Sequence, residues 1–206
     1  LSSGSARQPT DPGYHNVSGY DKGTFNIPIQ PPFGFPKESP LCGFASSGEP
    51  HDAAGIELTL RAPQNAHGFS FDFNFYSYEW PSFVCTTYND FFVANLEPFP
   101  AMQLDGNISF DSQGNPVSVN NGFFDVCQVK GCNTCPGGTG ELAGTGMGTT
   151  GGGTVWLTTT APVVPGEIMQ IEFMVFDVSD QILDSLTILD NFQWSIDPSS
   201  VGTHSG

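Results

Sequence analysis

Apolar and polar residues alternate most strictly in the segment FSFDFNFY, residues 69–76, and this alternation predicts a β-strand. One face carries Phe69, Phe71, Phe73 and Phe75, and the other carries Ser70, Asp72, Asn74 and Tyr76. A period of two with aromatic side chains on one face is typical of a half-buried strand. Because four phenyl rings must be shielded from water, a second layer of structure has to cover them. The segment therefore predicts the central strand of a two-layered β protein.

Shorter runs of the same kind predict further strands on both sides of this segment. They cover residues 56–62, 90–96, 107–111, 122–127, 154–160, 168–177 and 186–196. The sequence DSQGNP, between the third and fourth of these runs, predicts a hairpin turn. No helix of normal length is indicated. The pattern predicts an all-β fold, an antiparallel β-sandwich that is jelly-roll-like, with long loops and an extended N-terminal segment.

The predicted core takes one row of side chains from each of several strands. It comprises Phe69, Phe71, Phe73, Phe75, Phe173, Val175, Phe192 and Trp194. Ile56, Leu58 and Leu60 are expected to point inward as well. In residues 186–196 the apolar row also contains Asp190. Since a carboxylate buried alone is very costly, we expect Asp190 to be paired, hydrogen-bonded or metal-bound.

Composition divides the chain into a single domain with two flanking segments. Residues 1–40 are rich in Ser, Gly and Pro and predict an extended segment, either with an edge strand over residues 25–29 or loose. Residues 41–197 predict the sandwich, and residues 198–206 predict a short C-terminal tail. The Gly/Thr-rich residues 137–153 predict a mobile surface loop, because they lack a phosphate-binding pattern and any lysine.

Charge narrows the range of partners. The chain has 21 acidic and 5 basic residues, a formal net charge of −16. Such a surface repels phosphate backbones, so nucleic acid and anionic membranes are not expected as partners. It attracts divalent cations, although keeping a secreted protein soluble explains the same charge. No apolar run approaches the roughly twenty residues that span a bilayer, so membrane insertion is not expected. Residues 1–10 lack the pattern of a signal peptide, which predicts either a processed chain or a piece cut from a longer one.

The five cysteines predict disulfide bonds in an oxidising compartment. The predicted pairs are Cys42 with Cys85, and Cys127 with either Cys132 or Cys135, which leaves one cysteine over. Cys132 and Cys135 form a CxxC motif, which also suits zinc or redox chemistry. The histidines lie far away in sequence, however, and no thioredoxin-like βαβ pattern surrounds the motif, so disulfides are favoured.

Acidic residues concentrate in two segments that adjoin predicted central strands. Glu79, Asn89 and Asp90 lie in the first segment, and Asp177, Asp180 and Asp184 lie in VFDVSDQILDS. If the two segments meet at one end of the sandwich, their oxygen atoms suit Ca²⁺, although no EF-hand pattern is present. Solvated turn residues are the alternative, since Asp and Asn favour turns. The predicted calcium ligands are Glu79, Asn89, Asp90, Asp180 and Asp184.

Patterns that would indicate an enzyme are weak. The chain has no GxSxG or HExxH motif and no His near a candidate nucleophile. Glu79 with Asp90 or Asp184 is the first pair to consider for a glycosidase, but chance pairs of carboxylates are expected in a chain this acidic. The chain is therefore predicted not to be an enzyme.

Four stretches carry a resemblance to a known family. They are FDFNFYSYEWPSFVCTTYNDFFVANL, NISFDSQGNPVSVNNGFFDVC, GGGTVWLTTTAPVVPGE and VFDVSDQILDSLTILDNFQW. Together they resemble the choice-of-anchor L domain of bacterial, often myxobacterial, secreted and surface proteins, from about Cys42 to Trp194. The most specific parts are YND at residues 88–90 and DQILDS at residues 180–185. The resemblance implies an extracellular β-sandwich with a surface role; since VGTHSG carries no anchoring signal, release or assembly is an alternative to attachment.

These observations predict a non-enzymatic extracellular module, structural or adhesive, that calcium and disulfides stabilise. A carbohydrate-binding module is one alternative, in which Tyr78, Trp80 and Tyr88 stack on sugar rings, although packing beneath a loop is the commoner role of such residues. A self-assembling filament or multimer subunit is another, in which the N-terminal segment adds a strand to a neighbour's sheet. The expected partners are other surface proteins or glycans, or further copies of the chain.

Overall fold

The computed structural model describes the whole chain except residues 19–29, 43–47, 102, 104, 130–133 and 149. The predicted edge strand at residues 25–29 and Cys132 therefore lie outside the described residues. The strands are β1 (Pro50–Arg61), β2 (Gly68–Ser77), β3 (Phe91–Glu97), β4 (Phe124–Cys127), β5 (Gly152–Thr154), β6 (Leu157–Pro162), β7 (Ile168–Val178), β8 (Ser185–Ser195) and β9 (Gly202–Ser205). Two short 3-10 helices, η2 (Pro40–Cys42) and η3 (Gly140–Leu142), are the only helices in this part of the chain.

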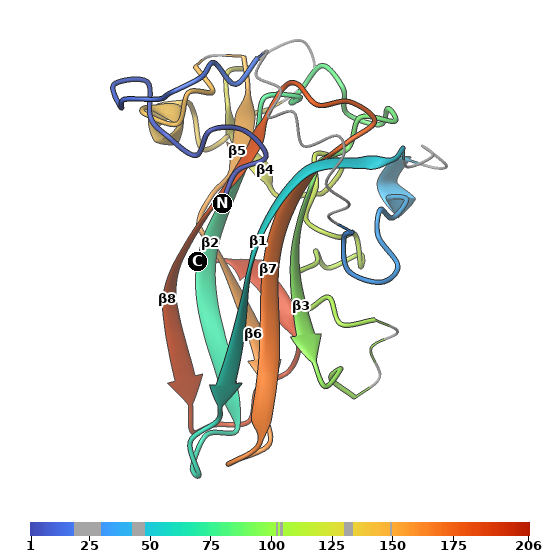
Figure 1. Cartoon of the computed structure of the whole chain (residues 1–206), viewed down its shortest axis with the longest axis vertical. Coiled ribbons are helices and arrows are strands. Elements are labelled where there is room, and N and C mark those ends of the chain that lie inside the picture. The colour runs from blue at the N-terminus through green and yellow to red at the C-terminus, as the bar shows by residue number, and fades with distance from the viewer. Residues whose placement is uncertain (19–29, 43–47, 102, 104, 130–133, 149) are drawn as a thin grey trace.

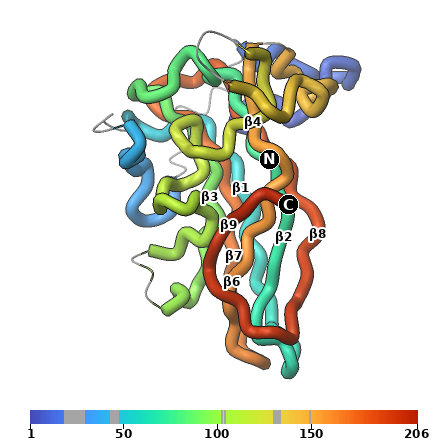
Figure 2. Tube along the Cα trace, turned by 180° about the vertical axis from the view of Figure 1, so that it is seen from behind, coloured from blue at the N-terminus to red at the C-terminus, as the bar shows by residue number. Residues whose placement is uncertain are grey.

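The strands form two antiparallel sheets that pack face to face (Figure 1). One sheet has three strands in the order β1-β7-β3. In the other sheet, β2 is central, with β8 along one edge and β6 and β5 along the other. The strands β9 and β4 extend this sheet beyond β6 and β5, as Figure 2 shows from behind. The predicted all-β antiparallel sandwich is confirmed.

The four phenylalanines of β2 form the centre of the core, as their alternation predicts. Phe69, Phe71, Phe73 and Phe75 are all buried, between 0 and 2% exposed. The Phe71 ring lies 4.9 Å from the ring of Phe173 on β7, and the Phe73 ring lies 4.6 Å from that of Phe92 on β3. The aromatic row of one sheet therefore packs directly against the inner face of the other.

The β8 strand differs from its prediction because a β-bulge interrupts it. Asp190 pairs with Asp72 and Gln193 pairs with Ser70, so two residues of β8, one of them Asn191 with φ +55°, oppose a single residue of β2. The bulge changes which side chains point inward. Leu189 and Trp194 contact the core, whereas Asp190 is exposed. The prediction that Asp190 lies in the buried row is wrong, and Phe192 is only partly covered, at 36% exposed.

The opposite face of β2 is also buried at its C-terminal end, which its polar residues do not predict. Tyr76 is 3% exposed and packs with Val126, Leu142 and Met147. A side chain at Gly153, which pairs with Tyr76, would overlap the tyrosine ring, so only glycine fits there. The Gly/Thr-rich segment therefore covers the sheet, and its prediction as a mobile surface loop is wrong.

Both edge strands on one side of the sandwich leave part of the core open. Ile56, Leu58 and Leu60 of β1 line a groove together with Leu189 and Phe192 of β8, with a volume of about 510 Å³. Ile56 is 45% exposed. The inward row predicted for β1 therefore faces this groove and is not enclosed, because β1 has a strand partner on one side only.

Two predicted boundaries change when non-local pairing is considered. The DSQGNP turn closes a single bridge between Phe110 and Pro116, whereas β4 pairs with β5 and not with residues 107–111. The predicted C-terminal tail contains β9, which pairs with β6. Since these partners lie far away in the sequence, local signals do not reveal them.

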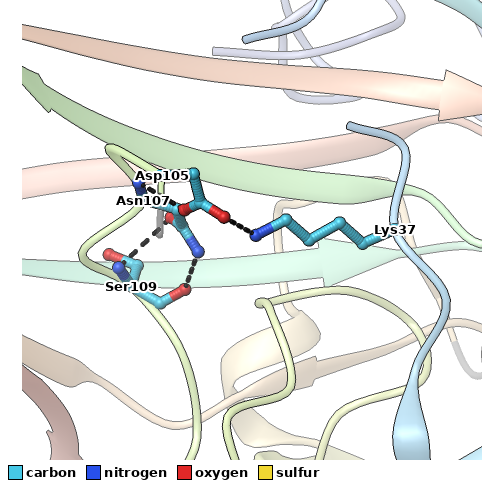
Figure 3. A network of polar contacts seen from close by, with 4 residues as sticks. All are labelled: Lys37, Asp105, Asn107 and Ser109. Atoms are coloured by element: carbon cyan, nitrogen blue, oxygen red, sulfur yellow. Dashed lines mark hydrogen bonds and ion pairs between the residues drawn. The ribbon is translucent and has the colours of Figure 1, made fainter. Parts of the chain in front are cut away.

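The segment that precedes β1 is held on the sandwich by charge and ring contacts (Figure 3). Lys37 forms an ion pair with Asp105 and lies 4.6 Å above the Phe35 ring. Asp105 accepts a hydrogen bond from the Asn107 backbone N–H, and the Asn107 side-chain amide donates to the Ser109 carbonyl at 2.9 Å. These contacts fix the loop that follows β3.

Two disulfide bonds are present, Cys42–Cys85 and Cys127–Cys135, with Cα–Cα distances of 5.0 and 5.2 Å. Both predicted pairings are confirmed, the second in its Cys135 form. Cys132 is then the cysteine left over. We expect alkylation of the secreted protein without reductant, followed by intact-mass measurement, to find one modified thiol per chain or a disulfide-linked dimer. Five modified thiols would contradict both bonds.

Candidate functional site

Five strand ends meet at one end of the sandwich, the upper end in Figure 1. The strands β1, β3 and β8 begin there, and β2 and β7 finish there, because they are antiparallel to those strands. The loop after β2 and the loop after β7 therefore meet, which is the condition that the calcium hypothesis set for the two acidic segments. Glu79 in the first loop interacts electrostatically with Asp180 in the second.

Four buried carboxyl groups occupy this end, and we call them the acidic cluster. They are Glu79 and Asp90, each 0% exposed, and Asp177 and Asp184, each 1% exposed. Burial raises the pKa of Asp177 well above its ordinary value, and the charges of Asp90, Asp184 and Glu79 raise it further. The four groups therefore act on one another within a region that excludes water.

The strand patterns explain why two of these carboxyl groups point inward. Asp177 continues the row of β7 that contains Val175. Asp90 precedes Phe92, on β3, by two residues in the same way. Because residues two apart lie on the same face of a strand, these two inner rows end in a carboxylate, whereas Glu79 lies in the turn that follows β2. Asp177 was noted in its segment but not predicted as a ligand, although the β7 row contained the signal.

Asp90 is the best-anchored member of the cluster. Its Oδ2 accepts a hydrogen bond from the Ser185 hydroxyl at 2.6 Å, and its Oδ1 accepts one from the Val178 backbone N–H at 3.2 Å. Burial raises the pKa of Asp90 to about 7, and these two hydrogen bonds oppose part of that increase. Asp90 thus joins the start of β3 to the end of β7 and the start of β8.

Glu79 has an oxygen with no hydrogen-bond partner. Its Oε2 accepts a hydrogen bond from the Asp90 backbone N–H at 3.4 Å, while its Oε1 is buried and has none. The pKa of Glu79 is raised to about 11. Burial is the largest cause, and the negative charges of Asp90 and Asp180 add to the increase. Without a cation, Glu79 is therefore protonated at neutral pH.

The other predicted ligands lie at or beyond the rim of the cluster. Asp180 is partly exposed; burial raises its pKa, while the Ile182 N–H and the charge of His51 lower it. Asn89 is buried, but its side-chain oxygen accepts a hydrogen bond from the Asn120 N–H at 3.1 Å. Of the five predicted ligands, the structure brings Glu79, Asp90 and Asp184 together, leaves Asp180 at the rim and turns Asn89 toward another loop.

No preformed metal geometry is present in the described part of the chain, where no three His, Cys, Asp or Glu side chains are arranged to hold an ion. The ion pair between Lys37 and Asp105 does not involve Glu79, Asp90 or Asp177. No described Lys or Arg therefore neutralises Glu79, Asp90 or Asp177. Because Glu79 and Asp90 are fully buried, a glycoside does not reach them in this conformation.

The three aromatic residues considered for sugar binding do not form one platform. The Trp80 ring stacks on Phe124 at 4.7 Å and is packed against the core. Tyr78 packs against the cluster of apolar residues on the outer face of β2, and Tyr88 makes an edge contact with Phe83 at 5.3 Å. Each ring therefore supports the fold of its own loop.

The comparisons with known proteins identify one family. The family model of the choice-of-anchor L domain matches residues 38–193. No curated protein and no solved structure matched the chain. The residues that the structure describes include no helix with the length and apolar character that a membrane crossing requires.

Proposed function

The chain belongs to the choice-of-anchor L domain family, and on this basis we propose that it is a non-enzymatic structural or adhesive module outside the cell, stabilised by calcium at the acidic cluster. The family indicates a surface module, and the two disulfides suit an oxidising, extracellular setting. Other surface proteins or glycans are the partners that such a role implies.

The buried charge of the acidic cluster is the observation that carries the calcium proposal. Burying several carboxyl groups together costs stability unless they are protonated or a cation balances them. Glu79, Asp90 and Asp177 have no described basic partner, and Glu79 Oε1 is buried without a hydrogen bond. A divalent cation would offset this cost and would give that oxygen a partner.

Calcium fits this set of oxygen atoms better than magnesium does. Ca²⁺ accepts six to eight oxygen ligands in flexible geometry, whereas Mg²⁺ requires a nearly ideal octahedron. Glu79, Asp90, Asp177 and Asp184 would supply carboxylate oxygens, with Asp180 within reach at the rim. The carboxylates would have to turn toward the ion, because no preformed geometry exists among the described residues. Ca²⁺, whose coordination geometry is flexible, is therefore the better candidate.

We expect EDTA to lower the melting temperature of the protein, and added calcium to restore it more completely than magnesium. A ligand that binds only the folded state stabilises it by about 2.7 kcal/mol at a hundredfold excess over its Kd. Differential scanning calorimetry with EDTA, Ca²⁺ or Mg²⁺ measures this effect. Asp90→Asn should abolish the response to calcium while nearly preserving the shape of the side chain.

Asp197→Asn is the matched control, because Asp197 is exposed and lies outside the cluster. Asp111, in the turn DSQGNP, also lies outside the cluster but would be a poor control, because it is buried and accepts hydrogen bonds from the backbone and side chain of Asn115. A melting temperature that ignores both EDTA and calcium would contradict the proposal. The module would then be stabilised by protonated carboxyl groups and disulfides alone.

Self-assembly is a second candidate function, supported by a specific pairing. Residues 1–3 already lie along the start of β8, where Ser2 forms a bridge with Leu186. The same segment of another copy could occupy this edge in exchange. Multimers that disappear when residues 1–36 are removed would support assembly, and a protein that stays monomeric at all concentrations would contradict it.

A further inference from the structure

Residues 1–3 lie along the edge of β8 beside the acidic cluster, where Ser2 forms an isolated bridge with Leu186, and we call them the N-terminal strand. The Thr187 N–H donates to the Leu1 carbonyl at 2.9 Å, and the Ser3 N–H donates to the Ser185 carbonyl at 3.0 Å. Ser2 and Ser3 are buried, at 6 and 0% exposed. Burial of two serines in this way indicates that residues 1–3 are an integral part of the sheet edge.

Two serines connect this strand to the carboxyl groups. The Ser185 N–H donates to the Ser3 Oγ at 2.9 Å, while the Ser185 hydroxyl donates to Asp90. The Ser3 hydroxyl donates to the Ser185 carbonyl at 3.2 Å, and its proximity to Asp177 lowers the pKa of that carboxyl group against the effect of burial. The strand and the Asp90 carboxyl group therefore share one hydrogen-bonded network through Ser185.

Gly4 closes the same region by direct contact. Its Cα lies so near the Asp184 carboxylate that a Cβ would overlap it. The Asp184 N–H donates to the Val17 carbonyl at 2.8 Å, so the chain after this strand returns to the cluster. A change in the position of the Asp184 carboxylate would therefore displace Gly4 and the N-terminal strand.

We propose that residues 1–4 are a positioning element of the cation site, and that their docking on β8 is coupled to calcium binding. This inference rests on the proposed calcium site. An ion that draws the carboxylates together holds Asp177 and Asp184 where Ser3 and Gly4 pack against them. Without the ion, nothing draws Asp177 and Asp184 together, so the strand that packs against them is held less firmly and opens more readily. By reciprocity, a docked strand tightens calcium binding by the same factor.

Hydrogen exchange of single amides in the full chain tests the coupling. We expect calcium to slow exchange at the amides of Ser3 and Thr187, relative to EDTA. The Ala62 amide, which donates to the Glu167 carbonyl near the far ends of β1 and β7, is the internal control and should not respond to the same extent. Equal exchange of the Thr187 amide in calcium and EDTA would overturn the inference.

Gly4→Ala tests the coupling from the other direction. The added methyl group displaces the strand from Asp184, so calcium affinity should fall by about 5- to 150-fold, the range of typical coupling between sites. Gly202→Ala is the matched control, because nothing lies within 4 Å of a Cβ at that position. If Gly4→Ala does not fold, Ser3→Ala, which removes only the hydroxyl group, provides the same comparison.

Titration calorimetry of the wild type separates this inference from the function on which it depends. If the wild type takes up no calcium, both fail together. If it binds calcium, but Gly4→Ala and Ser3→Ala bind with wild-type affinity, the coupling alone is wrong. Weakened binding in the variants together with calcium-dependent protection of Thr187 would support it.

Discussion

Phe73→Ala should destabilise the protein by about 3–5 kcal/mol, the usual cost of removing a fully buried phenyl ring. Phe73 is 0% exposed and contacts the rings of Phe71 and Phe92, with centroids 5.8 and 4.6 Å away. The variant would lose these contacts and leave a cavity between the two sheets, because neighbouring aromatic rings cannot collapse fully into the space. Denaturant unfolding followed by fluorescence measures the difference.

Phe33→Ala is the matched control for this variant. Phe33 is 84% exposed, so the same substitution should change the free energy of unfolding by no more than about 0.5 kcal/mol. A loss below about 1 kcal/mol for Phe73→Ala would mean that the β2 row does not form the core. Equal losses for both variants would point to the same conclusion.

In the presence of EDTA, stability should fall as pH rises from about 4 to 7. The pKa of Asp90 is raised to about 7 in the folded state, so the folded protein holds a proton there that the unfolded chain has already released. Each such group reduces the free energy of unfolding by about 1.4 kcal/mol per pH unit between its unfolded and folded pKa values.

Glu79 and Asp177 should extend this decline to higher pH, since burial raises the pKa of each of them as well. Calcium should reverse it, because cation binding requires ionised carboxylates and strengthens as they lose protons. Guanidinium unfolding at several pH values, with EDTA and with calcium, measures both slopes. Asp90→Asn should reduce the decline in EDTA. Stability that rises with pH in EDTA would show that the carboxyl groups are not buried together.

The inner rows of the sheets were predictable because alternation is a local signal. The row from Phe69 to Phe75 identifies the centre of the core, and the alternation of β7, continued beyond Val175, leads to Asp177. Glu79 lies in the turn after β2, so its place in the acidic cluster depends on the course of that loop. The cluster forms because β2 and β7, in different sheets, finish at the same end of the sandwich (Figure 1).

Other features depend on partners that the local sequence does not specify. A single bulge at Asn191 exchanges the two faces of β8 and moves Asp190 into solvent. The polar side of β2 is buried at Tyr76 because a distant Gly-rich segment is narrow enough to lie on it. Likewise, residues 1–3 pair with β8 across more than 180 positions of sequence. Pairing between residues so far apart leaves no periodic pattern in the local sequence, so the sequence alone does not predict it.

The Cys42–Cys85 disulfide determines which part of the module can bear a pulling force. It joins residues 43 positions apart and encloses β1 and β2 between them. When the chain is stretched from its ends, tension passes through the sulfur bridge, so neither strand carries load directly. At 3.3–3.6 Å per residue, about 150 Å of chain is withheld from extension. Single-molecule stretching should therefore find a longer unfolded chain after the disulfide is reduced. Until that bond is broken, β2 lies outside the path of the force.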